Sequence, residues 1–356
     1  MDPRVKPAGD GCKKNLERFV GKKIMTELTR RSLVAAAVLS PFAAHAQSNV
    51  QSTGQSTWPS GTIRIVVPFP AGGSVDTISR LVQTGLQQRL GVNVIVENRA
   101  GASGSTGSGV AAKSPPDGMT WLMVFDTHAV NPFLLPSMPF DTEKDLDPVL
   151  LIGTAPNVIC THPSRPWRSL ADVIAAAKQK PESITYGTVG AGSVGHLSMT
   201  LLANRAGIKL IHVPYRGGGP LLSDAIAGHV DLACGSTGLL GPHLSGGKII
   251  PLCHGGRTRL PGLPSLPTVI EEGFPDFESL AWWGLFAPAG TPKPIIDRFS
   301  AEFVASLHEE RVEKQVTEVQ MVNMTLGGPE ALRRFLADQM RLWSEVIREN
   351  NIKGDI

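Results

Sequence analysis

Aromatic residues make up only 6% of this 356-residue chain, and charged residues make up only 18%. Hydrophobic residues reach 42%, which is enough apolar side chain for a sizeable core and argues against a disordered chain. The 38 glycines and 28 prolines predict many tight turns and close approaches of the backbone. The length is typical of about two domains.

A lysine- or arginine-rich run is missing after residue 46. The formal net charge is +3, but residues 1–46 contain nine Lys or Arg and four Asp or Glu, which leaves 25 basic and 27 acidic residues in the remainder. The positive excess therefore belongs to the N-terminal segment, and no nucleic-acid partner is expected.

Cysteines are few, and three of the four follow residue 46: Cys160, Cys234 and Cys253. An odd number without a CxxC pair excludes a disulfide framework and a zinc knuckle. One disulfide remains open, and small buried thiols are the simpler interpretation. No Cys, His and Asp cluster has metal-ligand spacing, so neither a metal nor another cofactor is expected.

The N-terminal segment has the three parts of a secretory signal peptide. Arg30 and Arg31 precede an apolar stretch at 33–44, which is followed by Ala44-His45-Ala46. The stretch is too short for a membrane span, and a short buried helix is the alternative. We expect cleavage after Ala46 and export to the periplasm by the Sec or the twin-arginine route. No later segment is expected to span a membrane.

Short β-branched runs alternate with helical patterns along the rest of the chain, which predicts parallel α/β layers. Strands are expected at 63–69, 92–96, 121–125, 184–189, 210–213, 230–234 and 249–253. Helices are expected at 76–90, 110–113, 170–180, 196–206, 221–227, 294–308 and 329–350. Apolar segments near 149–162, broken at Pro156, and near 278–290 can pass between the two sets.

The two sets predict an α/β fold of two lobes that are joined by crossing strands and hold a ligand cleft between them. The expected parts are a leader at 1–46 with its true start at Met25, a linker at 47–60, a first lobe at 61–157, a second lobe at 158–248, and a return to the first lobe with the C-terminal helices at 249–356.

The first candidate site is a glycine turn at 68–76, at the carboxyl end of a predicted strand, where open α/β sheets bind ligands. Its glycines let the backbone approach a ligand, and the following helix start presents free N–H groups to an anion. A P-loop is excluded because GK[ST] is absent. A plain turn with Ser74 or Asp76 as N-cap is the alternative. The candidate contacts are Pro70, Ala71, Gly72, Gly73, Ser74 and Asp76.

The second candidate site, at 187–196, has the same order of strand, glycine turn and helix. Two helix N-termini that face each other would converge on one carboxylate. The candidate contacts are Gly190, Ala191, Gly192, Ser193 and His196, and His196 alternatively packs within the first helical turn. Ala191-x-Ser193-x-Gly195 also approximates a nucleophile elbow, although its first glycine is replaced and no HGGG-type segment occurs.

Three further segments are open to two interpretations. Asp126, Thr127, His128 and Asn131 either face the ligand or simply end the third strand. In Tyr215-Arg216, the arginine either pairs with a ligand carboxylate or lies in solvent, and solvent or a surface pair is preferred. The stretch 101–109 lacks the dinucleotide fingerprint and is interpreted as a flexible or helix-leading loop.

Motifs along most of the chain carry a family resemblance. They are Pro68-Phe69-Pro70-Ala71-Gly72-Gly73-Ser74-Val75-Asp76, Val96-Glu97-Asn98-Arg99-Ala100-Gly101-Ala102, Pro116-Asp117-Gly118, Asn131-Pro132, Gly192-Ser193-Val194-Gly195-His196-Leu197, His212-Val213-Pro214-Tyr215-Arg216-Gly217, Leu266-Pro267-Thr268-Val269 and Leu285-Phe286-Ala287-Pro288-Ala289-Gly290-Thr291-Pro292. Together these resemble the periplasmic receptors of tripartite tricarboxylate transporters, the Bug-type proteins, from residue 58 to about residue 352.

The resemblance implies a two-lobed fold of the type II periplasmic-binding-protein kind. It also implies capture of a small carboxylate between the lobes, largely by backbone groups and ordered water, and delivery to membrane permease subunits. The contacts carried over by position are residues 70–74, Asp76, residues 190–193 and His196; Thr127 and Tyr215 are added as candidates. Cys234-Gly235-Ser236-Thr237 departs from the family pattern, which often has Asp or Asn there.

The sequence therefore predicts a monomeric receptor that closes by a hinge motion when ligand binds, and not an enzyme. The alternatives are an exported serine hydrolase that uses Ser193 and a ligand-sensing module.

Overall fold

The computed structural model of this protein describes residues 58–244 and 246–352. The leader and most of the predicted linker lie outside these residues. The signal peptide, the cleavage after Ala46 and the start at Met25 therefore stay predictions. Within the described ranges, no helix is both long and apolar enough to cross a bilayer.

Ten strands occur in the described residues: β1 Ile63–Val67, β2 Val94–Asn98, β3 Thr120–Val124, β4 Leu146–Thr161, β5 Thr185–Thr188, β6 Ile211–Pro214, β7 Leu232–Ser236, β8 Ile250–His254, β9 Leu280–Pro288 and β10 Asn323–Gly327. The α-helices of the same ranges are α1 Ser74–Leu90, α2 Ser105–Ala112, α3 Thr127–Leu134, α4 Leu170–Gln179, α5 Val194–Ala206, α6 Gly218–Ala227, α7 Thr237–Leu244, α8 Lys293–Leu307, α9 Glu310–Lys314 and α10 Pro329–Glu349.

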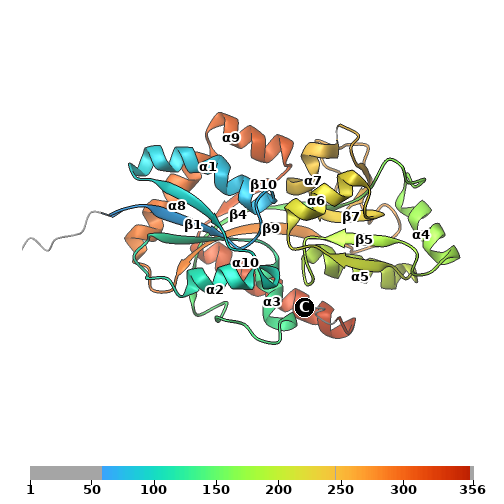
Figure 1. The fold of residues 1–356 in the computed structure, drawn as a ribbon, viewed down its shortest axis with the longest axis horizontal. Coiled ribbons are helices and arrows are strands. Elements are labelled where there is room, and N and C mark those ends of the chain that lie inside the picture. Colours follow the sequence, from blue (N-terminus) through green and yellow to red (C-terminus); the bar gives the residue numbers. More distant parts are fainter. Residues whose placement is uncertain (1–57, 245, 353–356) are drawn as a thin grey trace, which may run out of the picture. The chain divides into compact units, whose positions relative to one another are not determined.

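The strands form two groups that share the long strand β4. In the first group β1 pairs in parallel with β2 and β3, and β9 lies antiparallel between β3 and β4. In the second group β5 pairs in parallel with β6 and β7, and β7 lies antiparallel to β4. Figure 1 shows β4 and β9 between helices α1, α2 and α8 on one side and helices α4 to α7 on the other.

Strand β4 does not break at Pro156, although a break was predicted there. Pro156 is the last β4 residue opposite β9, and Asn157 is the first opposite β7. Proline has no N–H to donate to a neighbouring strand. It fits at this position because β4 changes its pairing partner there, from β9 to β7. One strand therefore passes through both groups.

Strand β8 pairs with the second half of β4, at Val158 to Thr161. Leu252, Val269 and Phe277 join the same buried cluster as β7 and helix α4. The chain thus returns to the first group near β9, about thirty residues later than the predicted return at 249.

Helix α3 was missed because Asn131-Pro132 is typical of a turn. Thr127 and His128, for which a ligand-facing position and the end of the third strand were both open, are its first two residues. Pro132 lies inside α3, and the helix ends at Leu134 because Leu135 has the extended conformation (ψ 131°) that a following proline favours. Helix α7 contains Pro242 and was missed for the same reason.

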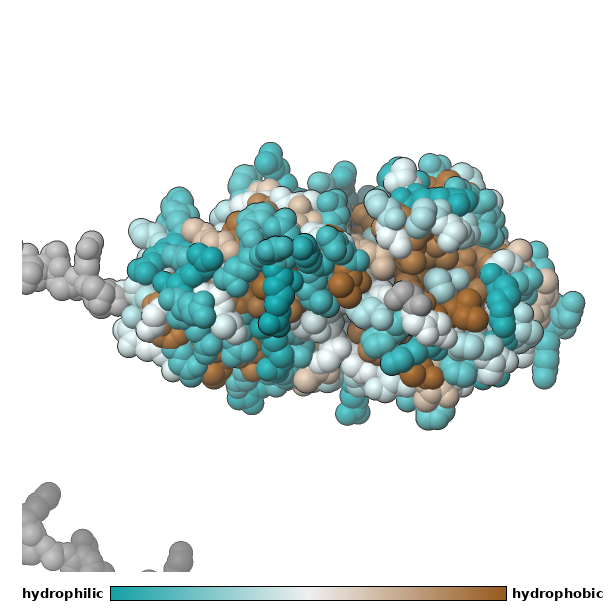
Figure 2. Space-filling model, turned by 90° about the horizontal axis from the view of Figure 1, so that it is seen from above, coloured by the Kyte–Doolittle hydropathy of each residue, from teal (hydrophilic) through white to brown (hydrophobic). Residues whose placement is uncertain are grey.

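Apolar side chains of both groups are buried against the central strands. Trp121 of β3 stacks on Phe299 of α8 with ring centroids 3.8 Å apart, and Trp283 of β9 is fully buried. Exposed large apolar residues are scattered, as at Ile211 and Leu342. Figure 2 shows the corresponding mixture of hydrophilic residues and small apolar areas on one face.

Helix α4 has a capping box, which predicts a measurable contribution to stability. Ser169 Oγ accepts from the backbone N–H of Asp172 at 3.2 Å, and the Asp172 carboxylate accepts from the N–H of Ser169 at 2.9 Å. We expect Ser169→Ala to lower the free energy of unfolding by about 1 kcal/mol. Urea denaturation measures this change. Ser223→Ala removes only a bond to the carbonyl of Gly219 within α6 and should be nearly neutral. Equal losses in both variants would show that the cap contributes nothing specific.

Candidate functional site

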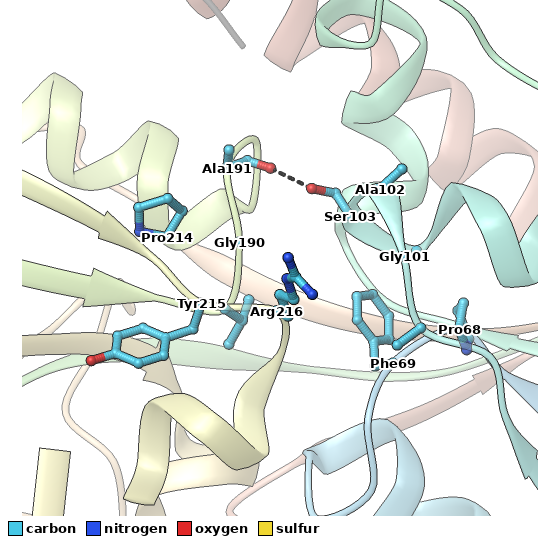
Figure 3. Close-up of a pocket in the computed structure, with 13 residues that line it drawn as sticks. Pro68, Phe69, Gly101, Ala102, Ser103, Gly190, Ala191, Pro214, Tyr215 and Arg216 are labelled. Atoms are coloured by element: carbon cyan, nitrogen blue, oxygen red, sulfur yellow. Dashed lines mark hydrogen bonds between the residues drawn. The ribbon is translucent and has the colours of Figure 1, made fainter. Parts of the chain in front are cut away.

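A cavity of about 460 Å³ lies between segments that follow four parallel strands, β1, β2, β5 and β6. Loops at the carboxyl ends of parallel strands are the usual ligand-binding position in α/β sheets. The lining residues are Pro68, Phe69, Ala100, Gly101, Ala102, Ser103, Gly104, Val189, Gly190, Ala191, Pro214, Tyr215 and Arg216. Figure 3 shows these segments facing one another.

A larger hollow of about 610 Å³ lies beside the crossing strands, against Pro156 and Leu280. Its arginines are already paired, Arg257 with Glu278 and Arg259 with Glu271, at 3.0 Å each. The smaller cavity instead presents backbone groups and a guanidinium without a described partner. We therefore place the candidate site in the smaller cavity.

The loop after β2 forms one wall of the cavity and has an unusual backbone. Gly101, Ala102, Ser103 and Gly104 all have positive φ, at 146°, 42°, 51° and 94°. Residues other than glycine rarely adopt a positive φ, because the Cβ atom is crowded there. Ala102 and Ser103 nevertheless have this conformation, so the backbone of the loop is strained. Residues 101–104 were not predicted to contact a ligand. They could have been, because they follow a strand and precede a helix, as the two predicted glycine turns do.

The loop after β5 forms the opposite wall, and its predicted residues Gly190 and Ala191 line the cavity. The Gly190 carbonyl accepts from Thr188 Oγ1 at 3.1 Å and from Ser193 Oγ at 2.8 Å. Ser193 also caps helix α5, because its Oγ accepts from the backbone N–H of His196 at 3.3 Å. The Ser193 side chain is fully buried. Its described hydrogen bonds all go to backbone groups, which disfavours a nucleophilic role.

His196 supports this loop from behind. Its Nδ1 accepts from the N–H of Gly192 at 3.2 Å, and its ring stacks on His212 with centroids 4.0 Å apart. His212 in turn lies 2.8 Å from Thr188 Oγ1. Burial and the neighbouring His196 lower the pKa of His212 to about 3, so the ring is neutral at ordinary pH. The pair holds the loop that presents Gly190 and Ala191.

One hydrogen bond crosses the cavity between the two walls. Ser103 Oγ donates to the carbonyl oxygen of Ala191 at 2.9 Å, as Figure 3 shows. Asn131 of helix α3 holds the same loop by donating to the Ser103 carbonyl at 3.0 Å. The strained loop after β2 is therefore tied both to its own group of strands and to the other.

The glycine turn after β1 meets a different partner from the one expected. A Cβ built on Gly73 would lie 3.6 Å from Gly218 N, and one built on Gly219 would lie 2.5 Å from Ala71 O. The turn thus abuts the start of helix α6, while residues 190–191 meet Ser103. Phe69 of the first predicted turn and Gly190 and Ala191 of the second nevertheless line the same cavity, together with the loop after β2.

Two predicted contacts on this turn are already bonded within the protein. Asp76 accepts from Gly72 N, Arg80 Nε and Asn98 Nδ2 at 3.0, 2.9 and 3.0 Å. Burial raises the pKa of Asp76, but these hydrogen bonds outweigh it and leave the pKa below its usual value. Ser74 Oγ accepts from Trp283 Nε1 at 3.2 Å. Both side chains hold the turn in place.

Tyr215 and Arg216 follow β6 and line the cavity from below in Figure 3. The Tyr215 hydroxyl points away and donates to Asp224 at 2.7 Å. Burial and this contact raise the pKa of Tyr215. Arg216 is exposed, as preferred from the sequence, and its side chain also lines the cavity. Thr127 and Pro70 lie nearby in the fold but not in the cavity lining, Thr127 buried at the start of α3.

The cysteines cannot form the disulfide that the sequence left open. Cys160, Cys234 and Cys253 are buried and free. Cys234 and Cys253 flank Ile159 of β4 from its two neighbouring strands, and Cys160 is the next residue, so its side chain points to the opposite face of the sheet. Within the described residues, no three His, Cys, Asp or Glu side chains lie close enough to hold a metal ion.

Comparisons with known proteins agree with this geometry. The family described as "Tripartite tricarboxylate transporter family receptor" matches residues 78–352. The solved periplasmic binding protein BugD has a TM-score of 0.79 and 28% identity, over 83% of this chain and 99% of its own. An R. palustris protein solved with adipate has a TM-score of 0.79 and 32% identity over the same shares. MatC from Rhodopseudomonas palustris, with bound malate, has a TM-score of 0.77 and 29% identity, over 82% of this chain and 100% of its own.

The family match covers most of the chain, and BugD superposes on more than four fifths of it. The chain therefore belongs to the receptor family of the tripartite tricarboxylate transporters and has the two-lobed α/β fold of periplasmic solute-binding proteins.

Proposed function

We propose that this protein captures a small carboxylate in the cavity between its lobes and delivers it to the membrane permease of a tripartite tricarboxylate-type transporter. The family match and the adipate and malate of the two related structures support this. The cavity of about 460 Å³ is of suitable size, since small-molecule sites span roughly 300–1,000 Å³. Export to the periplasm by the predicted leader is part of the proposal.

The observation that carries the proposal is the composition of the cavity wall. It consists of backbone groups and small or apolar side chains, with Arg216 as its one ionised residue and no acidic residue. Such a wall favours an anion, because N–H donors and a guanidinium both interact well with a carboxylate. Gly190, Ala191 and Tyr215 are the predicted contacts that line it. The others stay predictions: Pro70, Ala71, Gly72, Gly73, Ser74, Asp76, Thr127, Gly192, Ser193 and His196.

Strand pairing supports a division into lobes at two crossing points. The first lobe comprises residues 61–157 and the chain from about 280, and the second comprises about 158–279. Within the described residues, the chain passes between the two lobes in β4 and in the segment before β9. A bend at these points would open the cavity, and a ligand that contacts both walls would favour the closed arrangement.

A thermal-shift screen over carboxylic acids tests the proposed function. An acid present at 100 times its dissociation constant should stabilise the protein by about 2.7 kcal/mol, which raises the unfolding temperature by several degrees. Isothermal titration calorimetry then measures the affinity of each hit. No shift with any mono-, di- or tricarboxylate would contradict carboxylate capture. Ester turnover that Ser193→Ala abolishes would establish the hydrolase instead.

A further inference from the structure

The cavity contains one ionised side chain whose role the proposed function leaves open. Arg216 lies between β6 and α6 and lines the cavity. Figure 3 shows its side chain extending into the space between Gly190 and Phe69. Its side chain is exposed, so the guanidinium is accessible to a solute that enters the cavity.

Within the described ranges, the Arg216 guanidinium has neither a hydrogen-bond nor an ion-pair partner. Other arginines near the same strands are paired: Arg64 with Glu97 at 3.5 Å, Arg80 with Asp76 at 2.9 Å and Arg165 with Asp231 at 3.0 Å. The nearest acidic group along the chain, Asp224, is already engaged by Tyr215 and His229. The positive charge of Arg216 is therefore available to a ligand.

The backbone on both sides of Arg216 is held in place. The N–H of Tyr215 bonds to the Thr188 carbonyl at 3.0 Å, and the Tyr215 hydroxyl is anchored on Asp224. Gly217 has a φ of 126°, and a Cβ there would lie 2.8 Å from Pro70 Cδ, across the cavity floor. The backbone of Arg216 is therefore fixed where the two lobes meet. A ligand that pairs with its guanidinium has to order only the side chain, which lowers the entropy cost of binding.

The two kinds of donor in the cavity are suited to two separate anionic groups. The N–H of Gly104 is bonded to the Gly101 carbonyl, but the main-chain N–H groups of residues 101–103 and 190–191 can donate to a carboxylate without regard to the rest of the ligand. A planar guanidinium pairs with a second carboxylate through two parallel hydrogen bonds. A monocarboxylate would use only one kind and leave the charge of Arg216 without a partner.

We propose that Arg216 selects ligands with two carboxylates, by pairing with the carboxylate that the main-chain groups of the cavity do not hold. This inference rests on the proposed function, since it assumes that an acid binds in this cavity. It adds a specificity residue, and it assigns ligands with a carboxylate at each end as the favoured chemical class.

The test compares acids that differ only in the second carboxylate. The full chain, wild type and Arg216→Gln, is titrated calorimetrically with adipate and hexanoate, and with succinate and butanoate. We expect the wild type to prefer the diacid of at least one pair. In Arg216→Gln, affinity for that diacid should fall on the order of ten- to a hundred-fold, as for loss of a charge-assisted bond, and affinity for its monoacid should change less than about threefold.

Two further variants sharpen the result. Arg216→Lys keeps the charge but not the planar pair of donors, so it should recover part of the diacid affinity. Arg257→Gln changes an arginine that is paired with Glu278 in the other hollow, and it should leave all four affinities unchanged. Added salt should weaken diacid binding more in the wild type than in Arg216→Gln.

The outcomes separate this inference from the proposed function. If Arg216→Gln reduces the affinities for diacid and monoacid equally, or changes neither, the role of Arg216 is overturned. Carboxylate capture is left intact in both cases, because the acids still bind the wild type. Wild-type preference for the monoacids also overturns the role of Arg216. A wild type that binds none of the four acids but binds another carboxylate of the screen overturns only the preference for two carboxylates, and one that binds no carboxylate at all overturns both.

Discussion

Gly219→Ala is expected to weaken acid binding at least ten-fold while leaving the fold intact. A Cβ at this position would lie 2.5 Å from the carbonyl oxygen of Ala71, which belongs to the other lobe. Real Cβ atoms do not approach a backbone oxygen so closely, so the lobes would have to separate at this point. Gly219 lies in helix α6 and does not have a positive φ, so alanine suits its own backbone.

The expected loss follows from the population of the closed arrangement. Apparent affinity falls in proportion to the fraction of molecules that can bind, so a variant that closes one-tenth as often binds one-tenth as well. Calorimetric titration with the best acid of the screen measures the change, and urea denaturation checks the stability.

Gly61→Ala is the matched control, because a Cβ there has no atom within 4 Å. It should bind as the wild type does. If Gly219→Ala also bound with wild-type affinity and unchanged stability, the approach of Ala71 to helix α6 would not be part of ligand capture.

Asp126→Asn is expected to stabilise the protein at pH 8, and by more than at pH 5. The Asp126 side chain is buried just after β3, and no side chain of the described structure hydrogen-bonds to its carboxyl oxygens. Burial raises its pKa to about 8, although the backbone N–H groups of Val194 and Thr127 lower it in part. The folded protein therefore keeps a proton that the unfolded chain releases near pH 4.

The sign of the pH dependence follows from these proton counts. Between about pH 4 and pH 8 the unfolded state binds fewer protons than the folded state, so stability falls as pH rises, by up to about 1.4 kcal/mol per unit. Asparagine keeps the shape but releases no proton, so this slope should vanish and the variant should gain several kcal/mol over the wild type by pH 8.

Buried histidines act in the opposite direction and can be separated by the pH range. Burial lowers the pKa of His128 to about 3, and His212 has the same shift. Their pKa in the unfolded chain is about 6.5. Between about pH 3 and pH 6.5 the unfolded state therefore binds more protons than the folded state, and the stability of the fold decreases as the pH falls. Urea denaturation at pH 7 to 8, taken as the difference between wild type and variant, isolates Asp126.

Asp297→Asn provides a control, since this carboxylate on α8 is exposed and paired with Lys293. It should leave the slope between pH 7 and 8 unchanged. An Asp126→Asn variant that is less stable than the wild type at pH 8, with a parallel pH profile, would show that the carboxyl is ionised and well bonded when folded.

Local sequence patterns were sufficient for the parts of this protein that depend on near neighbours. A β-branched run predicted β1, and helical spacing of apolar residues predicted α1 and α10, because burial of one face is encoded in the period of the pattern. The glycines at 190 and 192, with positive φ, were expected at a turn that opens a helix. The family match at residues 78–352 covers every motif of the resemblance except the first, at 68–76.

Tertiary structure decided which of these turns meet and which side chains line the cavity. Asp76 was predicted to contact ligand, but Arg80 and Asn98 bind it, and Asn98 comes from a different strand. Arg216 was expected in solvent or in a surface pair; it is exposed, and β6 also brings it to the cavity. Such placements depend on contacts between residues far apart in the chain. The period of a helix or strand reflects only residues that are neighbours along the chain. Contacts between distant residues therefore cannot be predicted from it.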